Sequence, residues 1–527
     1  MMGSRSPMAL VVVCCALVSI LPAASRADVR VKARQVEQLL DDWRLTAAEK
    51  SLEELERSAP ANPYVKRARA RVLFHHGDHA RAAVLLQQIV GEQSDPDTRY
   101  LARLVSSTAK LVRGYVQQRS AGGHFLLRAA PGPDELLIPF AAETLEAARD
   151  RLLADLGHAP KHTVVVEIYG QPKDLARVSP LTEEDIRRTG TIALCKYQRL
   201  MIVSPRALPR GYGWRDTLAH EYAHLVVSQL THDRTPIWLH EGIAKYFEAR
   251  WRAALGAAPP LAPAQRHLLA QALAQKKLIP FAKMHPSMAK LPDQRSTALA
   301  FAQVQTAVDF LAGKRRNKPL KRLLLALREG ATVWEAVRRI SGLSKHAFQS
   351  AWRVHLEKRG LKPLPGLTFM RRNFGEKKSK EQRIAAIKRK RVRRYFRLAD
   401  MLRRRKLTRA AVLEYHKAHE LSGRRDAFIG NALARAKLEI GDPHAAIAAL
   451  LPVIEYYPEL AGVQTTLGLA YLRAGDRRHA VEHLKVALRI NPFTPEVHCG
   501  LANASSESAE VERFRAICRQ LGGGGSR

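Results

Sequence analysis

The sequence predicts an α+β unit, with a small mixed sheet and helices, flanked on both sides by all-α helical regions. Alanine, leucine and valine recur at three-and-four spacing before about residue 119 and again after about residue 392, as in helices that bury one face. Between these regions, short runs rich in valine and isoleucine alternate with amphipathic segments, which is typical of strands joined by helices. Because 46% of the 527 residues are apolar, we expect two to four domains with hydrophobic cores.

The first 27 residues have the features of a secretory signal peptide. A positive charge at Arg5 precedes an apolar run from Met8 to Leu21, and small residues end at Ala27. The run is shorter than the roughly 20 residues that span a bilayer, so a cleaved leader is favoured over a membrane anchor. We therefore expect removal of residues 1–27 and export to a periplasm or to the extracellular space.

Residues 28–120 predict a helical domain with a weak internal repeat. Ala48 and Ala82 lie 34 residues apart, and each is followed by an apolar half-turn and a proline, Pro60 or Pro96. This period is typical of stacked helical hairpins, and an ordinary helical domain is the alternative.

Residues 121–365 predict the α+β unit, after a break at 120–123. The pattern indicates a strand, a helix, a second strand and then two further strands, at 124–129, 135–156, 163–169, 191–196 and 199–204. Helices are expected again from Glu248 to about residue 358.

The stretch from 217 to 248 contains the cluster that we expect to hold a metal ion. His220 and His224 are four residues apart, so both imidazoles leave one face of a helix and can reach one zinc ion. Glu221 is offset toward the open side, where water would lie.

A catalytic zinc needs a third protein ligand, and Glu241 is the best candidate. Thr235 and Pro236 predict the N-cap and the first position of a second helix, which could pack beside the first and present Glu241 to the two histidines.

At these residues the chain resembles the gluzincin metallopeptidases. HEYAH at 220–224 matches their HExxH motif, and WLHEGIAKYFE at 238–248 is similar to the segment that carries their third ligand. The nearest likeness is to gluzincin-like domains embedded in tetratricopeptide-repeat proteins. The resemblance implies a zincin-like fold for the α+β unit, with His220, His224 and Glu241 holding one zinc ion and Glu221 as the general base. It also places the strand at 191–196 at the sheet edge, where an extended peptide could bind.

Two positions depart from the pattern of this family. Phe301 stands where similar domains often have a tyrosine that donates to the oxyanion, a contact worth about 3–4 kcal/mol. Lys245 replaces an acid that orients a ligand histidine in thermolysin-like enzymes, and Glu248 could take that place. Three tyrosines are possible substitutes for the missing hydroxyl, namely Tyr197, Tyr222 and Tyr246.

The chain has a formal charge of +38, and positive charge is densest at residues 371–406, where 17 Lys and Arg face three acids. We interpret 366–391 as a basic linker that continues into a basic helix. Attachment of this segment to an anionic envelope surface is the alternative. Nucleic acid is disfavoured as a partner, because the protein is expected outside the cytoplasm and few aromatic residues accompany the charges.

Residues 392–521 carry a clear 34-residue repeat. A small residue, a Gly-Asp pair, an alanine, a leucine and a proline recur at this displacement, as Ala434, Gly441-Asp442, Ala446, Leu450 and Pro458 and then as Gly468, Gly475-Asp476, Ala480, Leu484 and Pro492. This resembles tetratricopeptide repeats, in which paired helices present a surface to a protein partner. Cys499 and Cys518 could pair across the last hairpin, and residues 522–527 are expected to be a disordered tail.

The sequence therefore predicts an exported zinc-dependent metallopeptidase whose helical repeats position a protein partner or substrate. One alternative is an envelope scaffold whose gluzincin-like domain keeps zinc but has lost turnover, as Phe301 suggests. Another is a basic factor that binds anionic surfaces.

Overall fold

The computed structural model describes residues 26–91, 95–252, 261–288, 291–313, 318–370, 372, 374 and 379–523. The predicted signal peptide up to residue 25, and residues 524–527 of the predicted tail, lie outside this part of the chain. Within it, no helix combines the length and apolar character needed to cross a bilayer.

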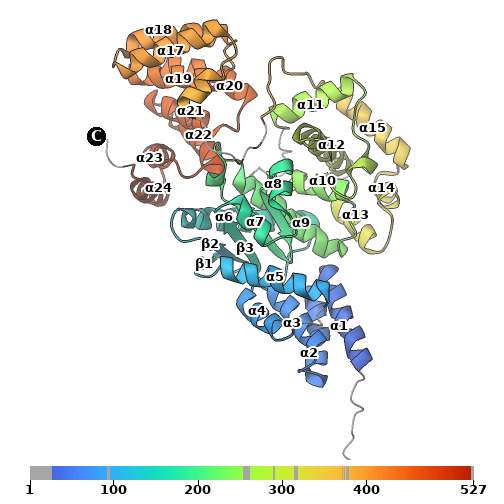
Figure 1. The fold of residues 1–527 in the computed structure, drawn as a ribbon. Coiled ribbons are helices and arrows are strands. Elements are labelled where there is room, and N and C mark those ends of the chain that lie inside the picture. Colours follow the sequence, from blue (N-terminus) through green and yellow to red (C-terminus); the bar gives the residue numbers. More distant parts are fainter. Residues whose placement is uncertain are drawn as a thin grey trace, which may run out of the picture.

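The centre of the molecule is a five-stranded mixed sheet (Figure 1). Its strands stand in the order β1 (Val116–Arg119), β2 (Phe125–Ala129), β3 (Val164–Tyr169), β5 (Arg199–Val203) and β4 (Ala193–Lys196). The strands β2, β3 and β5 run parallel, whereas β1 and β4 are antiparallel to their neighbours. The predicted strand at 191–196 is therefore an edge strand.

The strand β1 corrects the expectation that the first helical region continues to residue 119. Helix α5 ends at Leu111, and the next four-residue strand pairs with β2. All four of its side chains are exposed. A strand without a buried face has no apolar alternation, so the periodicity of the sequence gave no sign of it.

The two faces of the sheet are covered by different parts of the chain. Val164, Val166 and Ile168 of β3 belong to the main core, which includes residues of α6 (Leu137–Leu156) and α9 (Trp214–Thr231). On the opposite face, Val165 of β3 meets the turn after α3. A Cβ on Gly77 there would lie 2.7 Å from Val165 Cγ2, so only glycine permits this approach. The first helical region thus packs directly on the sheet.

Helices make up the two flanks (Figure 1). Those before the sheet are α1 (Arg26–Asp41), α2 (Leu45–Ser58), α3 (Pro63–His75), α4 (His79–Gln87) and α5 (Pro96–Leu111).

The central unit contains further helices of its own. Two short ones, α7 (Pro172–Arg177) and α8 (Glu183–Thr189), precede β4. After α9 come α10 (Ile237–Phe247), α11 (Pro263–Ala274), α12 (Gln294–Ala312), α13 (Pro319–Arg328), α14 (Val333–Ser341) and α15 (Lys345–Lys358).

The last helices form stacked hairpins with the predicted period. They are α16 (Lys380–Ala385), α17 (Lys390–Arg404), α18 (Thr408–Leu421), α19 (Ala427–Glu439), α20 (Pro443–Tyr456), α21 (Ala461–Arg473), α22 (Arg477–Ile490), α23 (Pro495–Ala504) and α24 (Ser508–Gln520). The first helices of successive pairs begin at 427, 461 and 495, which are 34 residues apart. The chain thus combines an α+β unit with helical regions on both sides, and the C-terminal region has the period of the predicted tetratricopeptide-like repeats.

The final three helices are joined to the core of the α+β unit. Leu484, Leu501 and Phe514 belong to the same buried cluster as Phe140 of α6. The backbone N–H of Tyr212 donates to the carbonyl of Ile490 at 3.1 Å. A disulfide between Cys499 and Cys518, expected as an option from the sequence, ties α23 to α24. The domain boundaries at 120, 365 and 391 stay predictions.

Candidate metal centre

Three predicted ligand side chains meet at one point between α9 and α10. The Nε2 atoms of His220 and His224, one helical turn apart on α9, lie 3.1 Å from each other. Glu241 enters from α10, and its Oε2 atom lies 3.4 Å from each of these nitrogens. The structure therefore brings together the three ligands that the sequence predicts, two from one helix and one from another.

The position of Glu241 depends on the close packing of α10. A Cβ at Gly242 would lie 2.8 Å from the carbonyl oxygen of Val304 on α12, so glycine is needed beside the acid. The predicted cap of α10 is shifted by one residue: Pro236 is the N-cap, and the Thr235 hydroxyl bonds to the Thr231 hydroxyl at 3.0 Å instead.

The three atoms fit a zinc ion. Ligands at 2.0–2.1 Å in a tetrahedron are separated by about 3.3 Å, and the observed separations are 3.1, 3.4 and 3.4 Å. Glu241 Oε2 is buried and has no hydrogen-bond partner among the described residues, which is costly unless a cation completes the site. Two imidazoles and one carboxylate are a donor set typical of zinc.

The outer side of His220 is held by Glu248. The Nδ1 atom of His220 lies 3.2 Å from Glu248 Oε2, and Lys245 Nζ lies 2.6 Å from the same carboxylate oxygen. Burial alone would lower the pKa of His220, but the nearby carboxylates of Glu241 and Glu248 outweigh it and raise the pKa to about 9. The pocket therefore favours a positive charge at this imidazole, as a proton or as a metal ion.

The outer side of His224 leads into a chain of hydrogen bonds that the sequence did not reveal. Its Nδ1 lies 2.9 Å from His240 Nδ1, His240 Nε2 lies 3.2 Å from Ser228 Oγ, and that hydroxyl donates to Asp233 Oδ1 at 2.9 Å. Burial and the neighbouring His224 lower the pKa of His240 to about 3. A neutral His240 can accept from His224 and donate to Ser228, which leaves His224 Nε2 with a free lone pair for a metal.

We expect His240→Ala to weaken zinc binding about 10- to 100-fold, because His224 loses the acceptor that orients it. His240→Asn should restore part of the loss, since an amide oxygen can accept from His224. Competition with a chromogenic chelator measures both affinities. His346→Ala, an exposed site on α15, is the matched control. Equal affinities for wild type and His240→Ala would show that the chain of hydrogen bonds does not support the site.

Glu221 lies beside these ligands and is buried. The backbone N–H of Cys195, on edge strand β4, donates to its carboxylate. Burial raises the pKa of Glu221, against the opposing effect of the two histidines. A carboxylate with a raised pKa is a better proton acceptor near neutral pH, which suits a general base.

The three tyrosines lie away from this centre. Tyr197 packs against Phe74 of α3, with ring centroids 5.1 Å apart. The ring of Tyr222 is buried against Phe125 of β2, and that of Tyr246 lies under the Arg250 guanidinium. The expectation that one of them supplies the missing hydroxyl is therefore not supported by their placement.

Phe301 does reach the site. Its ring centroid lies 6.4 Å from that of His220. The residue that departs from the family pattern thus occupies the place that the sequence assigned to it, but it carries no hydroxyl.

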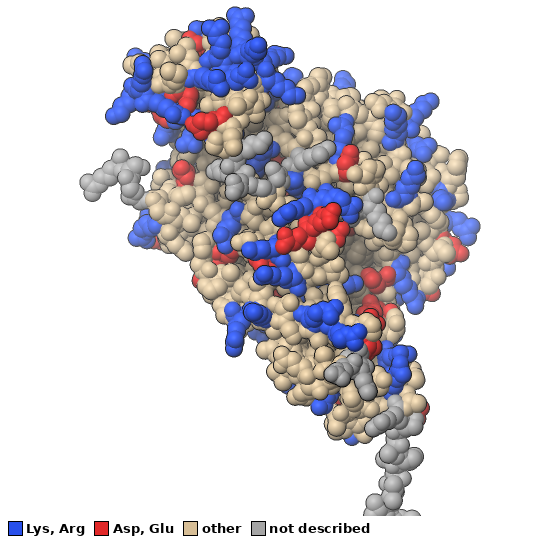
Figure 2. Space-filling model, in the orientation of Figure 1, with Lys and Arg blue, Asp and Glu red and all other residues tan. Residues whose placement is uncertain are grey.

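The basic segment leads into the first of the C-terminal hairpins, α17 and α18. Figure 2 shows Lys and Arg gathered where Figure 1 places α17 and α18. Part of the predicted linker is helical, since α16 buries Ile384 against Phe396 of α17. Several charges are paired, including Arg404 with Asp400 and Glu381. An anionic partner for this surface stays a prediction.

Comparisons with known proteins match part of the chain to one family. Residues 144–358 match the model of the Peptidase MA superfamily. No curated protein matches the chain in sequence.

Similar solved structures include yeast LTA4 hydrolase in complex with bestatin, at 11% identity over 77% of this chain and 66% of that one, with a TM-score of 0.27. The P58(IPK) TPR domain is 12% identical over 94% and 99% of the two chains, with a TM-score of 0.20. MamA (MSR-1 C2) is 17% identical over 25% and 75%, with a TM-score of 0.22.

These TM-scores are low, so the assignment of the centre depends on the family match and on this chain's own geometry. The matched residues contain the HExxH histidines, Glu221 and Glu241. Residues 144–358 are therefore similar to the Peptidase MA superfamily, the HExxH…E pattern lies within this match, and helices with a 34-residue period follow it.

Proposed function

We propose that the protein is an exported, zinc-dependent peptidase that hydrolyses peptide bonds, and that its helical repeats position a protein partner or substrate. The observation that carries this proposal is the convergence of His220 Nε2, His224 Nε2 and Glu241 Oε2 within 3.4 Å, with Glu221 beside them. Its setting in a peptidase MA-like domain supports the same reaction class.

A zinc ion held by these three residues would supply a Lewis acid that activates water and polarises a peptide carbonyl. Glu221 accepts the proton of the attacking water and later returns it to the leaving amine. The Cys195 N–H keeps the Glu221 carboxylate oriented during both transfers. Glu248 and His240 hold the outer nitrogens of the two histidines and so keep their rings in place.

The open edge of β4 is the natural place for an extended substrate. In the part of the chain that the structure describes, β4 pairs with β5 on one side only and stands last in the sheet. Its Cys195 contacts the proposed base, so a peptide added along this edge would run past the metal centre. Export is supported by the leader-like N-terminal sequence and by the Cys499–Cys518 disulfide, a bond that persists in oxidising compartments.

The test compares zinc content and hydrolysis in Glu241→Ala and in the wild type. We expect the variant to lose the zinc of this site and to stop cleaving an unfolded protein, because two histidines alone bind the metal weakly. Glu357→Ala, an exposed change on α15, serves as the control. A wild type that binds no zinc at this centre would show that the assignment is wrong.

A second candidate function follows from Phe301. A scaffold that keeps zinc without turnover would hold the metal in wild type and cleave nothing. In that case Phe301→Tyr, which adds a hydroxyl beside His220, should create cleavage.

A further inference from the structure

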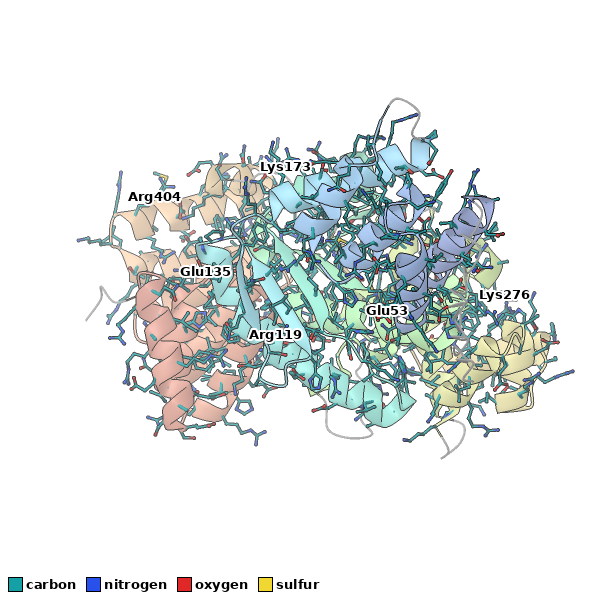
Figure 3. All side chains as sticks on the ribbon, turned by 90° about the horizontal axis from the view of Figure 1, so that it is seen from below. Glu53, Arg119, Glu135, Lys173, Lys276 and Arg404 are labelled. Atoms are coloured by element: carbon teal, nitrogen blue, oxygen red, sulfur yellow. A yellow bond between two sulfur atoms is a disulfide. The ribbon has the colours of Figure 1, made fainter. Side chains whose placement is uncertain are left out.

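A second group of metal-ligand side chains lies where the first helices meet the α+β unit. Glu49 belongs to α2, His76 follows the end of α3, and His162 precedes β3. These positions are far apart in the sequence, so no spacing motif joins them. In Figure 3, Glu53 marks α2, the helix that carries Glu49.

The two imidazoles approach different oxygens of one carboxylate. His76 Nε2 lies 2.5 Å from Glu49 Oε1, and His162 Nε2 lies 3.3 Å from Glu49 Oε2. The ligand atoms of all three lie within 4.8 Å of one another. The side chains are 26–33% exposed, so they are partly shielded but reachable from solvent.

An ordinary ion pair needs only one imidazole for each carboxylate. His124 and Glu146 form such a pair elsewhere in the structure, at 2.8 Å. At the junction, two nitrogens from separate segments meet one carboxylate, and Thr46 Oγ1 adds another oxygen 3.0 Å from His162 Nε2.

A small hollow beside this group contains further polar side chains. It is lined by His75, His76, His162, Gln198 and Gln229 on its polar side, and by Leu45, Pro160, Thr163 and Val164. His75 is buried, and within the described part of the chain its Nδ1 has no hydrogen-bond partner.

We propose that Glu49, His76 and His162 form a second zinc site, which is structural. Two imidazoles and one carboxylate are a donor set that suits zinc better than magnesium or calcium. The inference is independent of the proposed peptidase activity, since it uses none of the residues of the first centre.

The role of this site follows from what holds the first hairpin. The buried residues of α1 and α2 form a cluster with α3 that is separate from the main core. In the loop between them, Trp43 packs into the main core. A metal bound by α2, the end of α3 and the segment before β3 would fasten this hairpin to the α+β unit.

Counting zinc in four versions of the full-length mature protein tests the proposal. At a buffered free zinc concentration that saturates the first centre, we expect two ions in wild type, one in His162→Ala, one in Glu241→Ala and none in the double variant. His124→Ala, which alters the ordinary pair with Glu146, should keep two. His162→Gln provides a second variant if the alanine change impairs folding.

The counts separate the two proposals. One ion in wild type that persists in His162→Ala and disappears in Glu241→Ala would overturn the second site and leave the peptidase proposal intact. One ion that disappears only in His162→Ala would do the reverse.

Hydrogen exchange adds a readout that a simple loss of fold would not reproduce. Added zinc should slow exchange of the α2 amides in wild type and in Glu241→Ala, but not in His162→Gln. Equal exchange in α2 with and without zinc in Glu241→Ala would contradict a metal at the junction.

Discussion

Replacing Glu221 by glutamine is expected to leave the zinc content of the protein unchanged and to reduce peptide hydrolysis by at least about 10⁴-fold. Removal of an acid–base group commonly lowers the rate about 10²–10⁴-fold. The loss of rate should be at or beyond the top of this range here, because Glu221 is also needed to deprotonate the attacking water. Glutamine has the same shape and its carbonyl can still accept from the Cys195 N–H. Initial rates on a quenched fluorescent peptide library, with zinc measured on the same samples, check both parts.

Tyr222→Phe is the matched control for this experiment. It removes one hydroxyl on the same helix, and that hydroxyl has no hydrogen-bond partner in the described structure. Its activity should stay near that of wild type. If Glu221→Gln retained a substantial part of the activity, another residue would have to be the base.

Replacing Glu167 by alanine is expected to lower the free energy of unfolding by about 3–5 kcal/mol. Its carboxylate accepts from Arg199 Nη1 at 2.7 Å and from the Tyr169 hydroxyl at 2.6 Å, and it lies 2.7 Å from His79 Nε2. Glu167 and Arg199 are fully buried. Breaking such a pair from one side leaves an uncompensated charge, which costs far more than the intact pair contributes. Urea denaturation followed by tryptophan fluorescence gives the difference.

The same group predicts how stability depends on pH. Burial would raise the pKa of Glu167, but Arg199 and His79 outweigh it and hold the pKa well below its ordinary value. A carboxylate with a lowered folded-state pKa contributes its full stability above the unfolded value of about 4.3 and loses it as the pH falls toward the folded value.

Stability should therefore decline below about pH 4.3 in wild type, and this part of the decline should disappear in Glu167→Gln. Glu381→Gln, at an exposed pair with Arg404, should leave stability nearly unchanged, because water screens the pair. A loss of similar size in both variants would contradict the role of burial.

The grouping of residues at the metal centre could be predicted because each step rests on local geometry. Four-residue spacing places His220 and His224 on one face of any α-helix. Glu241 required a second helix to pack beside the first, and its surrounding segment indicated this. The structure adds Gly242 as the physical reason for the close packing.

Contacts that depend on tertiary placement could not be predicted. Tyr197, Tyr222 and Tyr246 were plausible by composition, but the direction of a hydroxyl depends on packing that no spacing encodes. His240 was visible beside Glu241, yet only the position of α10 against α9 shows that it meets His224. The group of Glu49, His76 and His162 was even harder to predict from the sequence, because its residues come from three separate segments.

The repeats show the same division between local and distant information. Their period of 34 residues could be read directly, because each hairpin repeats the same small residues and Gly-Asp turn. The contact between the last hairpins and the core of the α+β unit could not be predicted, because the residues that make it carry the ordinary pattern of the repeat. Phe514 and Ile517 belong to the same cluster as Leu218 of α9.

This shared core sets the time at which the candidate metal centre can form during synthesis. The ribosome delivers the chain from the N-terminus at roughly 5–20 residues per second, so α9 emerges long before the helices that complete its surroundings. Residues as late as Ile517 belong to the same buried core as α9. The core around α9 is therefore complete only once the last helices have been synthesised.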